Sequence, residues 1–354
     1  MTINLSLSPL WATTDIPPDS PLHASLQATL ETLRKVAGSH WVVTLSGGKD
    51  STLVTVLATE TFRRWPHLAP VSLDIVYADT LVEIPPLHQQ ALRLLDHVQT
   101  WAREHQAPIR VHRVLPSVEQ RFWFLILGKG YPPPHRAFWW CTKRLKVRPV
   151  QTVLQTLQAQ NGSQPITVLT GVRWGESQDR DRRLAAARAK ACVGQGECGQ
   201  TLQYQGALAP ILHWKTCQVW DFLAIYAPLW GWPTADLVTI YDQANTRFGC
   251  WACTVVKQER ALAGLIERQG GWEELKPLQD FRQKLLETAA NPQKRVRRPN
   301  GRAGKLTLEA RKELLAALLR AQEATGLSLI STEELQAIHA FWASRSPEEH
   351  NRYP

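Results

Sequence analysis

The sequence predicts an α/β protein: a doubly wound, mostly parallel sheet followed by a small C-terminal helical extension. Short runs rich in β-branched residues alternate with segments of helical spacing through most of the chain. This alternation is typical of parallel strands joined by helices that cover both faces of a sheet. Near residue 281 the pattern changes to a basic, turn-rich segment and two helices. We therefore expect an N-terminal segment over 1–27, the main domain over 28–280, and a basic linker with the helical extension over 281–354.

Hydrophobic periodicity places the individual elements. Strands are expected at 41–45, 71–80, 109–116, 165–173 and 208–214. Helices are expected at 51–60, 86–104, 146–160 and 216–226. In sheets of this kind ligands bind at the carboxyl ends of the strands, where the Gly47-Gly48 turn, Asp79 and the segment 171–173 fall.

The extension is expected to contain two helices. The first covers 308–325 and ends at Gly326, a residue that tolerates the left-handed conformation of a helix stop. The second opens with a capping box that begins at Ser331.

Composition favours a protein that binds a polyanion. The chain has 354 residues, of which 44% are hydrophobic, so it can bury a substantial core. Forty-one Lys and Arg against thirty-one Asp and Glu give a net charge of +10, which suits a nucleotide or nucleic-acid ligand. No run reaches the length of a membrane span, and residues 1–21 lack the order of a signal peptide. We therefore expect a cytoplasmic protein with no membrane partner.

Residues 46–51, Ser-Gly-Gly-Lys-Asp-Ser, join the first strand to the first helix. A glycine turn at a helix N-terminus offers N–H groups and the positive end of the helix dipole to an anion. Its glycines let the backbone approach phosphates, its hydroxyls can donate hydrogen bonds, and Asp50 could hold Mg²⁺ or cap the helix. The spacing departs from Gly-x4-Gly-Lys-Ser/Thr, which disfavours chemistry at a γ-phosphate. The alternative is a glycine-rich turn that binds nothing.

This loop resembles the PP-loop of the ATP pyrophosphatases, whose fold is that of the adenine nucleotide alpha-hydrolases. The resemblance implies that ATP is cleaved between its α- and β-phosphates and that the loop holds the departing pyrophosphate. The loop residues concerned are Ser46, Gly47, Gly48, Asp50 and Ser51.

A second segment, 169–183, follows the fourth strand. It is similar to the Gly-x-Arg-x-x-Glu-Ser-x-x-Arg segment of the adenylyl-sulfate and phosphoadenylyl-sulfate reductases, which share the PP-loop fold. Arginine forks suit phosphate or sulfate groups. The alternative is a solvated, charged helix start. The candidate nucleotide-binding residues here are Gly171, Arg173, Glu176, Ser177 and Arg180.

The cysteines suggest a metal centre. Cys250-Trp-Ala-Cys253 has the spacing of one edge of a zinc or iron–sulfur site, and the remaining ligands must come from elsewhere in the chain. Candidates are Cys141, Cys192 and Cys198. Zinc and thiols that bind no metal remain alternatives to an iron–sulfur cluster. Cys217, in an apolar helical segment, is expected to be a small buried hydrophobe.

One absence bears on the reductase alternative. Sulfonucleotide reductases need a nucleophilic cysteine near the C-terminus that takes up sulfite. The sequence after Cys253 contains no cysteine, so we expect that this chain is not a reductase of that type.

Several blocks together are similar to one family, the DNA phosphorothioation sulfurtransferases, the C subunit of the Dnd system. The blocks are SGGKDSTLVTVL, ADTLVEIPP, WWCTKRLKVRP, GVRWGES, RFGCWACTVV and GKLTLEARKELLAALLRAQ, and the likeness runs from about residue 28 to 343. The chain is shorter than the family pattern and lacks an insertion, with an extra cysteine, before RFGCWACTVV.

The resemblance implies a sulfurtransferase with ATP, Mg²⁺ and a [4Fe–4S] cluster. It also implies DNA, a cysteine desulfurase and other phosphorothioation subunits as partners. Cys141, Cys250 and Cys253 would ligate the cluster, and for the fourth ligand we favour Cys198 over Cys192.

The mechanism expected from this resemblance joins a phosphate oxygen of DNA to AMP, releases pyrophosphate, and lets a sulfur nucleophile displace AMP. Asp50, Lys49 and Arg173 are the candidate catalytic residues, and Arg180 would help to offset phosphate charge. Two alternatives remain: a sulfonucleotide reductase, and a non-catalytic iron–sulfur or zinc protein that binds nucleic acid.

Two further features could contact DNA. The segment 291–305 could bind the phosphate backbone, although a solvated linker is the alternative. Its basic residues are Lys294, Arg295, Arg297, Arg298, Arg302 and Lys305. Trp139 and Trp140, beside Lys143 and Arg144, could stack on bases, with packing in the core as the alternative.

Overall fold

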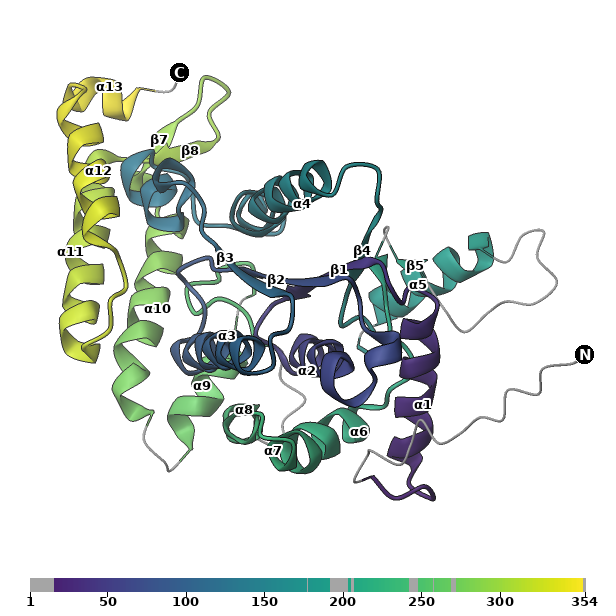
Figure 1. The fold of residues 1–354 in the computed structure, drawn as a ribbon. Helices are drawn as coiled ribbons and strands as arrows, with labels where there is room; N and C mark the ends of the chain where they lie inside the picture. Colours follow the sequence, from purple (N-terminus) through teal and green to yellow (C-terminus); the bar gives the residue numbers. More distant parts are fainter. Residues whose placement is uncertain are drawn as a thin grey trace, which may run out of the picture. The chain divides into compact units, whose positions relative to one another are not determined.

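The computed structural model describes residues 16–176, 178–191, 203–204, 207–241, 248–256, 258–268 and 272–352 (Figure 1). The chain divides into two compact units. The first unit consists of Met1–Tyr77, Leu87–Arg113 and Val153–Asp242. The second unit consists of Ala78–Pro86, Val114–Thr152 and Gln243–Pro354. The predicted boundaries at residues 27 and 280 stay predictions, and both fall within helices.

The first unit is built on a sheet with the strand order β3-β2-β1-β4-β6-β5. β1 pairs in parallel with both β2 and β4, β4 pairs in parallel with β6, and the short β5 is antiparallel to β6. The predicted α/β fold with a mostly parallel sheet is therefore confirmed. The strands are β1 (His40–Leu45), β2 (Ser72–Ala78), β3 (Ile109–Val114), β4 (Ile166–Leu169), β5 (Gln203–Tyr204) and β6 (Ala207–Leu208).

Helices cover both faces of this sheet. In Figure 1, α2 and α3 lie on one face and α4 lies on the other. α2 packs between β1 and α6, and its residues 51–61 are consequently all buried. The helices are α1 (Pro21–Arg34), α2 (Lys49–Arg64), α3 (Pro85–Glu104), α4 (Arg148–Gln160), α5 (Gln178–Ala191), α6 (Thr216–Asp221), α7 (Ala227–Leu229) and α8 (Ala235–Tyr241).

The strand order contains the expected switch point. From β1 the chain moves to β2 and β3 on one side of the sheet and then returns to β4 on the other side of β1. Loops that leave the carboxyl ends of β1 and β4 therefore diverge and leave space between them for a ligand. The segments 46–51 and 171–173 both begin at this point.

The strand predicted at 208–214 is much shorter in the structure, so its predicted extent was wrong. β6 ends at Leu208, and the residues that follow form turns in which Leu212 N–H bonds to Ala209 and Trp214 N–H bonds to Ile211. Pro210 has no N–H and cannot continue the ladder. Its carbonyl instead accepts a hydrogen bond of 3.0 Å from the Thr29 hydroxyl of α1.

The second unit is mostly helical. Its regular elements include two short π-helices (Phe124–Gly128 and Thr142–Val147), α9 (Arg260–Glu267), α10 (Lys276–Ala290), α11 (Leu308–Thr325), α12 (Thr332–Ala343), α13 (Pro347–Asn351), β7 (Arg295–Arg297) and β8 (Ala303–Leu306). β7 and β8 pair antiparallel, so the basic segment forms a hairpin rather than an irregular linker. Arg295 stabilises the hairpin because its guanidinium donates to the carbonyls of Gly304 and Ala289.

The predicted helix ends of the extension agree with the structure, with one difference. Gly326 adopts φ +66° directly after α11, and the Ser331 hydroxyl accepts the N–H of Glu334 at the start of α12. The second half of the capping box is not formed. The Glu334 carboxylate, which is 1% exposed, instead accepts the N–H of Phe124 at 2.9 Å.

Among the described residues, no helix is both long enough and apolar enough to cross a bilayer.

Candidate functional site

The loop 46–51 leaves β1 and turns directly into α2. Gly47 has φ +77°, and Gly48 is the N-cap residue of α2, whose first helical residue is Lys49. A Cβ at Gly47 would lie 3.1 Å from the Cβ of Ala91, so this position combines a left-handed backbone with little space. The chain therefore reaches a helix N-terminus within a single tight turn, as an anion-binding loop requires.

Hydrogen bonds between its two serines hold the loop in shape. The Ser51 hydroxyl accepts the N–H of Ser46 at 3.1 Å and donates to the carbonyl of Gly48 at 3.0 Å. The two serine hydroxyls are also 3.0 Å apart. Because these bonds join the first and last residues of the loop, its N–H groups are positioned before any ligand binds.

Gly171 presses against the same loop from the end of β4. A Cβ at this position would lie 2.7 Å from the carbonyl carbon of Asp50 and 2.8 Å from the nitrogen of Ser51. Both are backbone atoms, which cannot move aside as the end of a flexible side chain can. Gly171 therefore allows the loops from β1 and β4 to touch, and this contact brings together two segments that the sequence predicted separately.

Asp50 lies at the centre of a charged cluster. Its carboxylate bonds to Arg173 Nε at 2.6 Å and to Lys49 Nζ at 2.9 Å. Arg173 is only 3% exposed, so this pair is largely shielded from solvent. Both oxygens of Asp50 hold a cation, and Gly48 rather than Asp50 caps α2, so the structure does not present this carboxylate as an open Mg²⁺ ligand. Its predicted role as a magnesium ligand stays a prediction.

The segment after Arg173 is organised by Glu176. The Glu176 carboxylate accepts the N–H of Arg173 at 3.3 Å and bonds to Arg180 at 2.5 Å. The two predicted arginines are therefore both tied to carboxylates, and Arg173 is oriented through both its backbone and its side chain. Ser177 lies outside the described residues.

Tyr241, at the end of α8, is a site residue that the sequence did not reveal. A Cβ at Gly48 would lie 3.2 Å from its hydroxyl oxygen, and Lys49 Nζ lies 5.7 Å from the centre of its ring. Burial raises the pKa of Tyr241, and the negative charge of Asp50 raises it further, while a hydrogen bond with the backbone of Lys49 opposes them. The phenol therefore keeps its proton at neutral pH and can donate a hydrogen bond to an anion at the loop.

A model of the phosphoadenosine phosphosulfate reductase domain matches residues 40–256, a span that includes both loops and the Cys-x-x-Cys. The chain belongs to this family. The match fits a loop fixed at the switch point of a parallel sheet, and it makes this protein a member of a family of enzymes of the PP-loop superfamily.

Two solved structures are more distantly similar. One, phosphoadenylyl-sulfate (PAPS) reductase from Candida auris in a phosphate complex, is 17% identical, with 66% of this chain and 95% of that chain covered and a TM-score of 0.38. Another, the U34-tRNA thiolase NcsA from Methanococcus maripaludis with its [4Fe-4S] cluster, is 12% identical, with 75% and 80% covered and a TM-score of 0.33. No curated protein matches the chain. Both likenesses are too distant to assign a function.

The second unit contains three of the predicted metal ligands, Cys141, Cys250 and Cys253. Burial raises the pKa of both Cys141 and Cys250, and the charge of Cys253 raises each of them further, so Cys253 lies within electrostatic range of both. Within the described part of the chain their Sγ atoms do not all lie within 4.8 Å. Cysteine thiolates are ligands of both zinc and iron–sulfur centres, so these three residues could take part in either kind of site.

Cys250 is a half-buried thiol with polar and charged neighbours. Burial raises its pKa to about 12, and the nearby Lys146 partly opposes this. The Thr80 hydroxyl lies 3.9 Å from its sulfur, and the backbone of Cys250 forms a bridge with Glu83. Burial lowers the pKa of Lys146, but Cys250 and Glu83 outweigh it and raise that pKa overall. A positive charge beside Cys250 would stabilise its thiolate when a metal takes its proton.

Other predicted residues have different positions. Asp79 is fully buried in the second unit, where its carboxylate accepts the N–H of Leu81 at 2.9 Å, so its predicted contact with nucleotide stays a prediction. Cys217 is exposed, and the expectation of a buried hydrophobe was wrong because α6 buries its neighbours Gln218 and Val219 instead. Cys192 and Cys198 lie outside the described residues.

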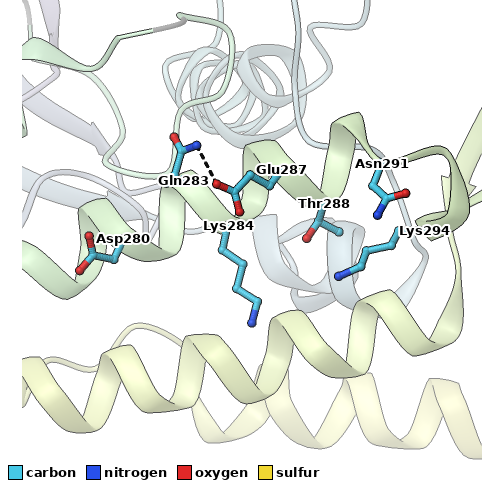
Figure 2. Close-up of a pocket in the computed structure, with 7 residues that line it drawn as sticks. All are labelled: Asp280, Gln283, Lys284, Glu287, Thr288, Asn291 and Lys294. Carbon is cyan, nitrogen blue, oxygen red and sulfur yellow. Dashed lines mark hydrogen bonds between the residues drawn. The ribbon is translucent and has the colours of Figure 1, made fainter.

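A pocket of about 530 Å³ lies along α10 (Figure 2). Its lining residues are Asp280, Gln283, Lys284, Glu287, Thr288, Asn291 and Lys294. It contains no residue of the loop and none of the cysteines. Because carboxylates and amines alternate around it, it favours neither an anion nor a cation.

Proposed function

We propose that this protein is an ATP pyrophosphatase and sulfurtransferase that activates a phosphate oxygen of the DNA backbone for replacement by sulfur. The observation that supports this most is the contact between Gly171 and the Asp50-Ser51 backbone. It joins a helix N-terminus, a lysine and a shielded Asp–Arg pair into one anion-binding site at the switch point.

The chemistry divides into two displacements. A phosphate oxygen of DNA attacks the α-phosphorus of ATP, a new P–O bond forms, and the bond to the β-phosphate breaks to release pyrophosphate. A sulfur nucleophile then attacks the DNA phosphorus, a P–S bond forms, and AMP leaves with the oxygen. The first step converts a very poor leaving group into AMP, so that the second step becomes possible.

The residues of the loop have distinct roles in this scheme. The N–H groups at the start of α2 and the Tyr241 hydroxyl would hold the pyrophosphate. Lys49 and Arg173 would offset its developing charge, because both are already positioned by Asp50. Asp50 is accordingly a positioning residue for two cations in this proposal.

The cysteines of the second unit would hold a [4Fe–4S] cluster through Cys141, Cys250 and Cys253, with the fourth ligand at Cys198 or Cys192. When bound, the cluster would carry sulfur or hold these segments together. The sulfur would come from a cysteine desulfurase, and other phosphorothioation subunits would supply the choice of DNA sequence.

The test is product analysis with ATP labelled at the α-phosphate, in protein purified without oxygen, with Mg²⁺ and with or without duplex DNA. We expect AMP with pyrophosphate, or label on the DNA. Asp50→Asn should lower turnover by about 100-fold, because Lys49 and Arg173 lose the charge that positions them. Asp236→Asn is the matched control, since Asp236 is 66% exposed and pairs with Arg93 at the surface. Release of ADP with phosphate would contradict the proposal.

A second candidate is a sulfonucleotide reductase, and the family match favours it. The same preparation is therefore offered phosphoadenylyl sulfate or adenylyl sulfate with a dithiol reductant. Sulfite release at a rate above that of AMP formation from ATP would replace the proposed function with this one.

A further inference from the structure

Residues 135–139 form an exposed turn that ends in two aromatic side chains. The N–H of Phe138 donates to the carbonyl of His135 at 2.8 Å, and a second backbone bond of 3.4 Å returns from His135 to Phe138. Trp139 is 61% exposed and Phe138 is 37% exposed. Among the described residues, no other tryptophan or phenylalanine is so accessible. A tryptophan ring left in water at the end of a closed turn is free to stack on a ligand.

The neighbouring residue anchors the turn in the core. Trp140 is buried, and its indole N–H donates to the carbonyl of Pro132 at 3.1 Å while its ring stacks on Phe122. The carbonyl of Pro134 accepts a further bond of 2.6 Å from the Thr254 hydroxyl. The turn is therefore anchored on both sides, and a ligand that stacks on Trp139 would lose little of its binding energy to ordering the protein.

The sequence around the turn contains basic residues and no acidic ones. Residues 120–175 contain no aspartate or glutamate. Arg136 and Lys143 are exposed, and no ion pair joins either of them to another described residue. Arg144 lies over the ring of Tyr131, which in turn contacts Phe138. Exposed aromatic rings beside cations are the features that bind bases and phosphates of single-stranded nucleic acid.

We propose that the turn 135–139 stacks on an unpaired base of a nucleic-acid strand, with Arg136 and Lys143 on the adjoining phosphates. This inference rests on the proposed function, because it names the part of the DNA substrate that the second unit binds. An apolar protein partner fits less well, since the exposed basic residues Arg136 and Lys143 lie close in sequence to the two aromatic rings.

The test compares two labelled single strands of equal length and charge, one of oligodeoxythymidine and one with abasic sites, by fluorescence anisotropy without ATP. Trp139→Ala should weaken binding to the thymidine strand by about 5- to 150-fold and leave binding to the abasic strand unchanged. Trp139→Phe should restore most of the affinity, because a phenyl ring still stacks. Leu229→Ala, at a side chain that is 68% exposed, is the control and should change neither affinity.

The cations have a separate signature. Arg136→Ala and Lys143→Ala should weaken binding to both strands equally and reduce the slope of log affinity against log salt by about 0.7 for each phosphate that is no longer neutralised. Oligouridine and oligodeoxyuridine strands, which differ only in the sugar, identify whether the ring prefers a ribose or a deoxyribose strand.

Several outcomes would overturn the inference. These are an unchanged affinity of Trp139→Ala for the thymidine strand, an equal loss of affinity for the abasic strand, and a native oligomer that Trp139→Ala dissociates, which would place the ring between copies of the chain. Binding is measured without ATP and repeated in Asp50→Asn, so failure of the two proposals can be told apart. Base-dependent binding without formation of AMP and pyrophosphate would remove the proposed function alone, and the reverse result would remove this inference alone.

Discussion

At the scale of single residues, Gly171 sets how closely two loops approach. A methyl group there would meet the backbone of residues 50 and 51 at less than 3 Å, so one loop must move. We predict that Gly171→Ala lowers ATP affinity, because the first turn of α2 is displaced from its position against Arg173. Isothermal titration with a non-hydrolysable ATP analogue measures this. Gly264→Ala in α9 is the control, since its nearest atom would lie 4.0 Å away.

Cys250 provides a second prediction at this scale. If it ligates an iron–sulfur cluster, Cys250→Ser should lose most of the visible absorption of protein purified without oxygen. Cys217→Ser should keep the absorption of the native protein, because Cys217 is exposed and lies in the first unit. A Cys250→Ser protein with full absorption would remove this residue from the ligand set.

The site residues that the sequence predicted are neighbours in the chain, whereas the one that it missed contacts them from a distant segment. Ser46, Gly47 and Gly48 are contiguous, so the residue types of this short segment are enough to predict its turn. Tyr241 reaches the same loop from α8, and nothing near it in the sequence marks a phosphate site. An interaction made across the fold leaves no local pattern, and only the packing of α8 reveals it.

At the scale of elements, some basic side chains of the β7–β8 hairpin bond within the protein, whereas others are exposed and could contact phosphates. Arg295 bonds within the hairpin and Lys294 pairs with Glu313 of α11, whereas Arg297 and Arg302 are exposed near its turn. The pKa of Lys305 is lowered by burial and by the neighbouring Arg311 and Arg345, so positive charge is concentrated beside the hairpin.

We predict that the Arg297→Ala, Arg302→Ala double variant binds duplex DNA more weakly. The slope of log affinity against log salt should fall by about 0.9 for each phosphate that the variant no longer neutralises, and Tm should remain that of the native protein. Arg320→Ala, at an exposed position of α11, is the control. An unchanged salt slope in the double variant would show that the hairpin does not bind DNA.

Elements with strong periodicity were the ones that sequence could place. β1, α2, β2 and α3 lie within a few residues of their predicted positions, since apolar residues at helical spacing and short β-branched runs leave a clear pattern. The segment 208–214 failed for the opposite reason. It is apolar like a strand, but Pro210 turns it away and its side chains pack as buried turns.

At the scale of the whole molecule, a buried acid couples stability to pH. Burial raises the pKa of Glu334 to about 7, above its ordinary value of 4.5. The folded protein therefore holds this proton more tightly than the unfolded chain does, and the free energy of unfolding falls as pH rises from about 4.5 to about 7.

We predict that Glu334→Gln flattens this fall, because glutamine stays neutral and can still accept the N–H of Phe124. The difference in free energy of unfolding, variant minus native protein, should increase by up to about 3 kcal/mol from pH 5 to pH 8. Urea unfolding at both pH values, followed by tryptophan fluorescence, measures the difference. Parallel pH profiles for the two proteins would contradict it.

The fold class followed from the order of strands and helices, whereas the two compact units are interleaved along the chain. A boundary near residue 280 was expected where composition changes, and this residue lies within α10. Amino-acid composition shows where the sequence becomes basic, whereas a compact unit is defined by packing between segments that are distant in sequence. A boundary predicted from composition can match a boundary between units only when each unit is a continuous stretch of the chain.

The interleaving of the two units limits how such a protein can be taken apart. The chain passes from one unit to the other at residues 77–78, 86–87, 113–114, 152–153 and 242–243. A single protease cut or a single fusion point therefore never yields one complete unit. We therefore expect that the loop 46–51 of the first unit and Cys141, Cys250 and Cys253 of the second can be moved to another scaffold only together.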